Sequence, residues 1–126
     1  MVFGDRPLKQ LFMSIKIKSL TKNKEFDQVF KTRCSCYCQS IGLKILANDI
    51  DQNRLGIIIS RKVSKKAVDR NKLKRRIKEI FRAKTEKLLV GYDILVITFP
   101  GVDEKTYQEL AIMLEQGLNK LKILKQ

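Results

Sequence analysis

The chain has 126 residues, 44% of them hydrophobic, which is enough for one globular domain with a single buried core. Its formal net charge is +14, from 27 Lys and Arg against 13 Asp and Glu, and such an excess points to a polyanionic partner, either nucleic acid or an anionic membrane. There is no His, which excludes a His general base, a Ser-His or Cys-His pair and any His metal ligand.

The N-terminal segment carries no targeting pattern. No apolar run is long enough to span a membrane, and the first residues lack the apolar core and cleavage site of a signal peptide, so we predict a cytoplasmic protein. Residues 1–18 are predicted to be an N-terminal extension, whether ordered or disordered, with Met13 as an alternative start. Residues 19–126 are predicted to form a single domain. A short helix is expected over 21–31, because Phe26, Val29 and Phe30 follow the i, i+3, i+4 spacing.

Three cysteines alternate along the chain at Cys34, Cys36 and Cys38. On a strand, strict alternation places all three on one face. A zinc site needs four ligands in suitably spaced pairs, and here there are three thiols, no His and no second cluster. We therefore expect reduced cysteines at the start of a strand and no metal site.

The next segments predict strands. Residues 39–46 alternate between polar and apolar side chains, as in a half-exposed strand, and 47–53 form a polar turn. The β-branched run 54–60 predicts a central strand, and 92–98 predicts another buried strand. Between these two strands lies a helical pattern, so the segment 54–98 should form a parallel crossover.

Two more helices are expected. The first covers 67–89, with Gly91 just past its end, and its apolar spacing is carried by Leu73, Ile77, Ile80, Phe81 and Leu88. After a turn at 99–101, Asp103 is expected to cap the last helix, whose apolar stripe is Tyr107, Leu110, Leu114, Leu118 and Leu121. The order α-β-β-(β)-α-β-α predicts an α+β fold, a two-layer sandwich of a small mixed sheet with packed helices.

The positive charge is concentrated in one segment. Residues 61–82 contain 11 basic and two acidic side chains, whereas 103–126 contain four of each. On a helix, the apolar residues of this segment occupy one arc, and a separate arc holds Asn71, Lys74, Arg75, Lys78 and Arg82. Pairs such as Lys74 and Lys78 repel each other at i, i+4. A bound polyanion would relieve this repulsion.

The basic helix admits several interpretations. A charge run is often only a solvated face, but the one-sided stripe argues against this. A membrane-surface helix needs free bulky apolar residues, whereas here the apolar arc should pack on the sheet. No helix-turn-helix, zinc finger or zipper pattern favours DNA. Proteins bind single-stranded RNA with aromatic side chains on a sheet, which contact the bases, and with Arg and Lys, which contact the phosphates. Phe26 and Phe30 beside a basic helix would fit this arrangement. Packing of both rings in the core is an equally good interpretation.

The basic segment resembles the protein subunit of bacterial ribonuclease P. That family has a motif close to Ala-Val-x-Arg-Asn-x-x-Lys-Arg-x-x-Arg-Glu-x-Phe. The matching residues are Ala67, Val68, Arg70, Asn71, Lys74, Arg75, Glu79 and Phe81. Segments 24–30, 91–97 and 105–110 resemble the family's first helix, last strand and final helix, so the resemblance covers about residues 19–124.

Three positions depart from the family pattern. The second arginine of the motif is Lys78, which turns a bidentate phosphate fork into a point charge. Lys44 occupies a place where some members have an aromatic residue facing the cleft. Arg33 stands where the family often has Gly after the first helix.

The resemblance implies a fold like that of ribosomal protein S5 domain 2. In that fold the βαβ crossover is left-handed, whereas such crossovers are almost always right-handed. It implies the removal of the 5′ leader from precursor tRNA, with Mg²⁺ bound mainly by the catalytic RNA and the substrate. The protein would then bind both RNAs, without catalytic residues, metal ligands, a membrane or a small-molecule substrate.

The expected RNA-binding residues combine the helix stripe with the segment before it. They are Arg61, Lys62, Lys65, Lys66, Arg70, Asn71, Lys74, Arg75, Lys78 and Arg82. Phe26, Phe30 and Lys44 would line the leader cleft, and Glu79 would pair with nearby cations. Two rivals remain open: an RNA-binding module of the ribosome-associated kind without a reaction, and a DNA-binding regulator.

Overall fold

The computed structural model describes residues 18–48, 50 and 52–124. The predicted extension therefore lies outside the described residues, apart from its last residue, and so does Met13. That last residue, Lys18, begins a two-residue strand, β1 (Lys18–Ser19), which pairs in parallel with Arg54 and Leu55. The sequence prediction missed β1 because two residues are too few to show a period.

Across residues 18–48, 50 and 52–124, the sheet has five strands in the order β1-β4-β5-β3-β2. The other four strands are β2 (Ser35–Cys38), β3 (Ile41–Ala47), β4 (Arg54–Ile58) and β5 (Tyr92–Thr98). β3 is antiparallel to both β2 and β5, whereas β4 and β5 are parallel, as predicted. β2 was expected only as the start of a strand, and β3 begins later than predicted because Gln39, with a φ of 55°, and Ser40 form the turn of the hairpin.

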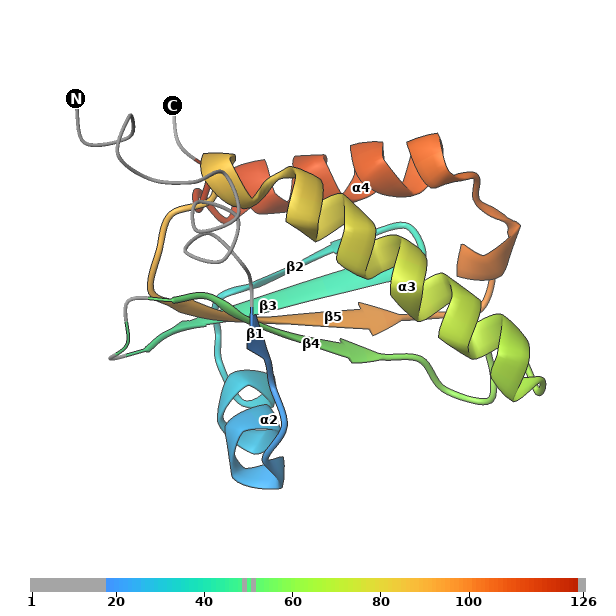
Figure 1. Ribbon diagram of the computed structural model, residues 1–126, viewed down its shortest axis with the longest axis horizontal. Coiled ribbons are helices and arrows are strands. Elements are labelled where there is room, and N and C mark those ends of the chain that lie inside the picture. Colours follow the sequence, from blue (N-terminus) through green and yellow to red (C-terminus); the bar gives the residue numbers. More distant parts are fainter. Residues whose placement is uncertain (1–17, 49, 51, 125–126) are drawn as a thin grey trace, which may run out of the picture.

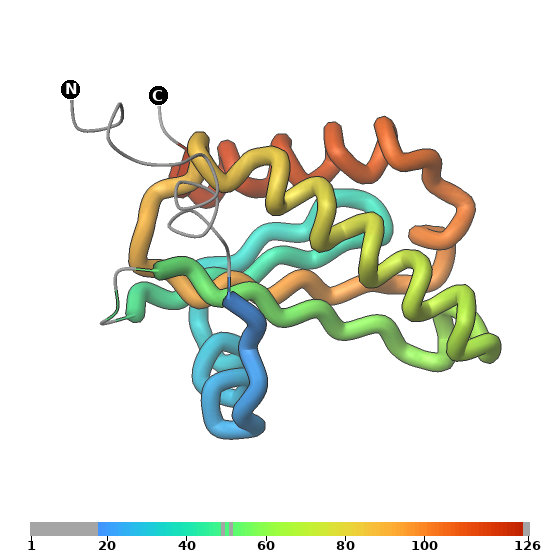
Figure 2. Tube along the Cα trace, in the orientation of Figure 1, coloured from blue at the N-terminus to red at the C-terminus, as the bar shows by residue number. Residues whose placement is uncertain are grey.

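The described residues contain three α-helices: α2 (Asn23–Phe30), α3 (Ala67–Ala83) and α4 (Tyr107–Lys120). Figure 1 shows α3 and α4 on one face of the sheet and α2 on the other, and Figure 2 shows the same arrangement along the Cα trace. α3 connects the parallel strands β4 and β5, and this crossover is left-handed. The α+β class and the mixed sheet agree with the prediction.

Each face of the sheet has its own apolar cluster. The larger one lies under α3 and α4 and includes the fully buried Phe81, Ile94, Val96 and Leu114. The smaller one lies under α2 and consists of Leu20, Val29 and Leu95. β3 and β5 are therefore covered on both sides, which is why they read as nearly continuous apolar runs.

The end of α3 corrects one prediction. The helix ends at Ala83, six residues before the predicted Leu89, and a 3₁₀ turn, η2 (Thr85–Lys87), follows. Leu88 is apolar because it is fully buried, where it forms an isolated antiparallel β-bridge with Leu124. It follows the apolar spacing of the helix without being part of the helix. Gly91 adopts a φ of 99°, but it does so just before β5 rather than at the helix end.

The start of α4 corrects another prediction. Asp103 lies in a 3₁₀ turn, η3 (Val102–Glu104), and the helix is capped by Thr106. The Thr106 hydroxyl accepts from the Glu109 N–H at 3.1 Å, and the Glu109 carboxylate accepts from the Thr106 N–H at 3.0 Å. Of the predicted stripe, Leu110, Leu114 and Leu118 are buried, Leu121 is half-buried and Tyr107 is 42% exposed.

Candidate nucleic-acid interface

α3 turns one face to the core and the other outward. Its buried side chains share one face, which sets the rotation of the helix about its axis. They are Leu73, Ile77, Ile80 and Phe81. Because this face is fixed in the larger apolar cluster, the cationic residues on the remaining arc are directed toward solvent.

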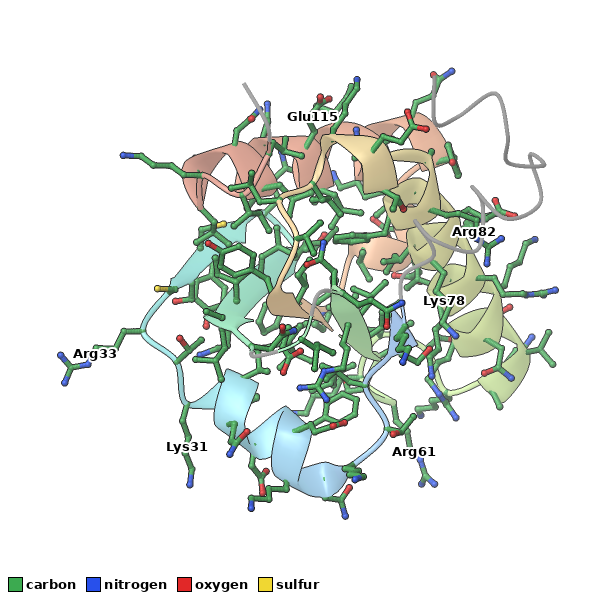
Figure 3. All side chains as sticks on the ribbon, turned by 60° about the vertical axis from the view of Figure 1, so that its left-hand side comes forward. Lys31, Arg33, Arg61, Lys78, Arg82 and Glu115 are labelled. Carbon is green, nitrogen blue, oxygen red and sulfur yellow. The ribbon has the colours of Figure 1, made fainter. Side chains whose placement is uncertain are left out.

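None of the ten side chains predicted to bind RNA is buried. Arg70 and Lys78 are half-buried, and eight are exposed: Arg61, Lys62, Lys65, Lys66, Asn71, Lys74, Arg75 and Arg82. Figure 3 shows Arg61, Lys78 and Arg82 along one side of the molecule, whereas Lys31 and Arg33 extend from the opposite side. We call these ten residues the basic surface; that they bind RNA stays a prediction.

The positive charge of the basic surface is not neutralised within the described part of the chain. There, three ion pairs form: Arg54 with Glu25, Arg54 with Asp93, and Lys84 with Glu115. None involves a member of the basic surface. Glu79, expected to pair with nearby cations, makes no ion pair within residues 18–48, 50 and 52–124. The surface can therefore offer its charge to an external anion.

The loop before α3 extends the basic surface past the helix. The Arg70 guanidinium donates to the Ser64 carbonyl at 2.9 Å, and the Lys66 N–H donates to the Ser64 hydroxyl at 3.3 Å. Arg70 therefore holds the loop against the first turn of α3 as well as contributing charge. Together with Arg61, Lys62 and Lys65, it surrounds an open hollow of about 560 Å³.

A second candidate surface lies where α2 meets the sheet. Phe26 is half-buried over Gly56, where an added Cβ would come within 2.6 Å of the Phe26 ring. Phe30, one turn later, is 52% exposed. Phe26 is thus largely part of the packing between α2 and β4, the alternative left open by the sequence, while Phe30 presents its ring to solvent.

Lys44 supports α2 from the sheet. Its ammonium donates to the Phe30 carbonyl at 2.9 Å and lies 5.1 Å from the centroid of the Phe30 ring. The charge therefore satisfies a carbonyl at the C-terminus of α2, where a cation is favoured, and makes a cation–π contact. The structure brings Phe26, Phe30 and Lys44 together at α2, whereas their role in lining a leader cleft stays a prediction.

A polar network that the sequence did not reveal fixes α2 to the sheet. Arg54 on β4 donates to both carboxylate oxygens of Asp93 at 2.7 Å, and it also pairs with Glu25 on α2. The Asp93 side chain is only 3% exposed, and the Asn48 amide donates to it at 2.9 Å. The bond with Asp93 raises the pKa of Arg54. The Lys22 N–H, more than Arg54, lowers the pKa of Glu25.

Comparison with known proteins identifies the family. The model of the Ribonuclease P family matches residues 15–122. The chain belongs to the ribonuclease P protein family. The ribonuclease P protein component of Clostridium botulinum (strain Loch Maree / Type A3) is 36% identical over 107 residues, which are 84% of this chain and 96% of that protein. That of Alkaliphilus metalliredigens is 31% identical over 105 residues, 83% of this chain and 94% of that one.

Solved structures agree with this assignment. The Staphylococcus aureus RNase P protein superposes with a TM-score of 0.78 at 31% identity, covering 87% of this chain and 100% of that one. The RNase P protein from Thermotoga maritima gives 0.71 at 33% identity, over 83% and 96% of the two chains. The resemblance seen in the sequence is confirmed, and with it the fold of the ribonuclease P protein family.

The three cysteines lie within the described part of the chain and are free thiols. Within it, no three Cys, Asp or Glu side chains gather in a way that could hold a metal ion. Cys36 and Cys38 contact α4 through the Gly117 carbonyl and the Gln116 side chain, at 3.4 and 3.5 Å. Cys34 precedes β2 and is exposed. None of the helices described is long and apolar enough to cross a membrane.

Proposed function

We propose that this chain is the protein subunit of ribonuclease P, which binds the catalytic RNA and the 5′ leader of precursor tRNA in the cytoplasm. It would assist the Mg²⁺-dependent endonucleolytic removal of the leader. Family membership supports the reaction. The observation that carries the proposal is the basic surface: ten residues of α3 and the preceding loop, none buried and none in an ion pair with another described residue.

The basic surface is the proposed contact with the catalytic RNA. Arg and Lys side chains along α3 suit phosphates, since a helix face spaces them along a ridge and a folded RNA offers its backbone. Asn71 adds an amide that can donate to a phosphate or a 2′-hydroxyl. Lys78 contributes a point charge where a guanidinium would give two bonds.

The face of the sheet beside α2 is the proposed contact with the leader. Phe30 is exposed there, and Lys44 places a positive charge next to its ring. Unpaired bases of single-stranded RNA stack on such aromatic rings, whereas paired bases are not accessible. Phe26 contributes mainly by holding α2 in place over Gly56.

The Mg²⁺ of the reaction is assigned to the RNA in this proposal. Glu25 on α2 and Asp93 on β5 both pair with Arg54, and no three Cys, Asp or Glu side chains of the described residues gather in a way that could hold a metal ion. We therefore assign no metal ligand to the described residues. The protein acts by binding and positioning RNA, and the phosphodiester chemistry belongs to the catalytic RNA and its ions.

Reconstitution tests the proposed function. The chain alone should not cleave precursor tRNA, because no catalytic group is assigned to it. Added to ribonuclease P RNA at low Mg²⁺, it should restore or accelerate the removal of the 5′ leader, measured by gel analysis of end-labelled substrate. If the chain binds RNA but leaves cleavage unchanged, the rival of an RNA-binding module without a reaction is favoured. If it binds duplex DNA in preference to RNA, the regulator is favoured.

A further inference from the structure

α2 covers only part of its face of the sheet. Strand pairing places Ile58, Ile97, Gly42 and Tyr37 in one row across β4, β5, β3 and β2. The neighbouring row carries Gly56, Leu95 and Lys44, and α2 packs on that row through Phe26 and Phe30. In Figure 1, the end of this face toward the C-terminal ends of β4 and β5 has no helix over it.

Two aromatic rings lie at the end of the row that contains Tyr37 and Gly42. Tyr37 is 56% exposed and Phe99 is 37% exposed, and their ring centroids lie 6.1 Å apart at an angle of 47°. Both rings approach Gly42: an added Cβ there would lie 2.7 Å from the Tyr37 ring and 3.4 Å from the Phe99 ring. The missing side chain lets Tyr37 rest on the strand backbone, so one part of each ring is supported and the rest faces outward.

We propose that Tyr37 and Phe99 form a stacking platform for a base of the 5′ leader, beyond the part of the leader that reaches Phe30. This inference rests on the proposed function. Rings that already touch each other and the sheet lose little freedom when a base stacks on them. Tyr37 and Phe99 therefore extend the leader path across the sheet, from α2 to the β2–β3 hairpin.

The charges around the platform favour RNA as the occupant. β4 and β5 are parallel, so Phe99 after β5 and Arg61 after β4 leave the sheet at the same edge, and Arg61 belongs to the basic surface. Lys44 lies in the adjacent row. A strand of RNA on this face would thus have cations near its phosphates and rings under its bases, the combination found in single-strand binding surfaces.

Substitution of each ring tests the platform. Holoenzymes reconstituted with ribonuclease P RNA would carry Phe99→Leu or Tyr37→Leu, and binding would be measured for precursor tRNAs whose leaders lengthen one nucleotide at a time. Each variant should bind long-leader substrates about five- to 150-fold more weakly, the range for one lost base–aromatic stack, and should bind mature tRNA equally well. Phe99→Tyr and Tyr37→Phe should bind as the original does. Tyr107→Leu, at an exposed tyrosine on α4, is the matched control.

An abasic site moved along the leader locates the stacked base. An abasic site at one leader position should weaken the binding of precursor tRNA to the original holoenzyme. The same abasic site should not weaken its binding to the Phe99→Leu holoenzyme, because the stack is already lost in that variant. Equal abasic effects in both holoenzymes, or leader-length profiles unchanged by both Leu variants, would overturn the platform while the proposed function stands. An original holoenzyme that does not distinguish precursor from mature tRNA would overturn both. Thermal unfolding checks that each variant is folded. If Tyr37→Leu does not fold, Phe99→Leu alone tests the platform.

Discussion

At the scale of single residues, the spacing of the apolar residues along α2 does not show which of them pack against the sheet and which remain exposed for binding. Phe26 and Phe30 are four residues apart and belong to the same predicted stripe, yet one lies over Gly56 and the other is 52% exposed. The difference arises because β4 has a glycine where the Phe26 ring descends, whereas the Lys44 side chain lies near the Phe30 ring. Which strand residue faces a helix position depends on register, and register cannot be predicted from the helix alone.

Alanine substitutions at these two positions should have different effects. Phe26→Ala should lower the free energy of unfolding by about 2–3 kcal/mol, below the cost for a fully buried Phe because the ring is half-buried. Phe30→Ala should cost about 1 kcal/mol, chiefly the cation–π contact with Lys44, but should weaken binding of precursor tRNA more than of mature tRNA. Urea denaturation and binding to the reconstituted holoenzyme measure the two effects. Equal losses of stability would show that both rings are core.

At the scale of elements, α2 is joined to the sheet by a network whose members are far apart in sequence. Glu25, Arg54 and Asp93 come from α2, β4 and β5. The sequence predicts each element but not the network, because Arg54 and Asp93 become neighbours only through the register of β4 and β5. An acidic residue inside a buried apolar run was the one available signal, since such a charge must find a partner.

Removing Arg54 should be costly because Asp93 would stay buried without its partner. We expect Arg54→Met to lower the free energy of unfolding by about 3–5 kcal/mol, the cost of breaking a buried pair. The double variant with Asp93→Leu should recover most of that loss, because it leaves no unpaired charge. Urea denaturation compares the two. If the double variant is no more stable than Arg54→Met, packing rather than charge determines the cost.

The N-termini of α2 and α4 predict an acid dependence of stability. The backbone N–H of Thr106, followed by its side chain, lowers the pKa of Glu109, and the Lys22 N–H does the same for Glu25. A carboxyl whose pKa is lower in the folded than in the unfolded chain stabilises the fold above its ordinary value of 4.5, and this contribution is lost as pH falls through the folded pKa.

A Gln substitution removes this titration. Glu109→Gln should therefore be less stable than the original protein at neutral pH, and the difference should shrink as the pH is lowered below the ordinary glutamate pKa. Denaturant unfolding at several pH values measures it. Glu86→Gln, an exposed change of the same charge in η2, is the control. A stability difference that does not depend on pH would mean that the ionisation of Glu109 does not contribute to the stability of the fold.

At the scale of the whole molecule, the sequence predicted the basic surface well because two independent patterns coincide on α3. Apolar residues at helical spacing set which face is buried, and Lys and Arg occupy the remaining arc. The open end of the sheet could not be predicted in this way. Tyr37 and Phe99 are 62 positions apart and meet only because β2 and β5 flank β3, so that Gly42 lies beneath both rings.

The salt dependence of RNA binding tests the basic surface as a unit. If about six phosphates are contacted, affinity for ribonuclease P RNA should fall about a thousandfold between about 50 and 200 mM salt, because condensed counterions are released on binding. Replacing Lys74, Arg75 and Lys78 by Ala removes about three contacts and should roughly halve the slope of log affinity against log salt. The matched control replaces Lys31, Arg33 and Lys120, exposed cations outside the basic surface, two of which Figure 3 shows on the opposite side. Both triple variants lose the same net charge, so a slope reduced equally in both would mean that total charge, rather than the ridge along α3, holds the RNA.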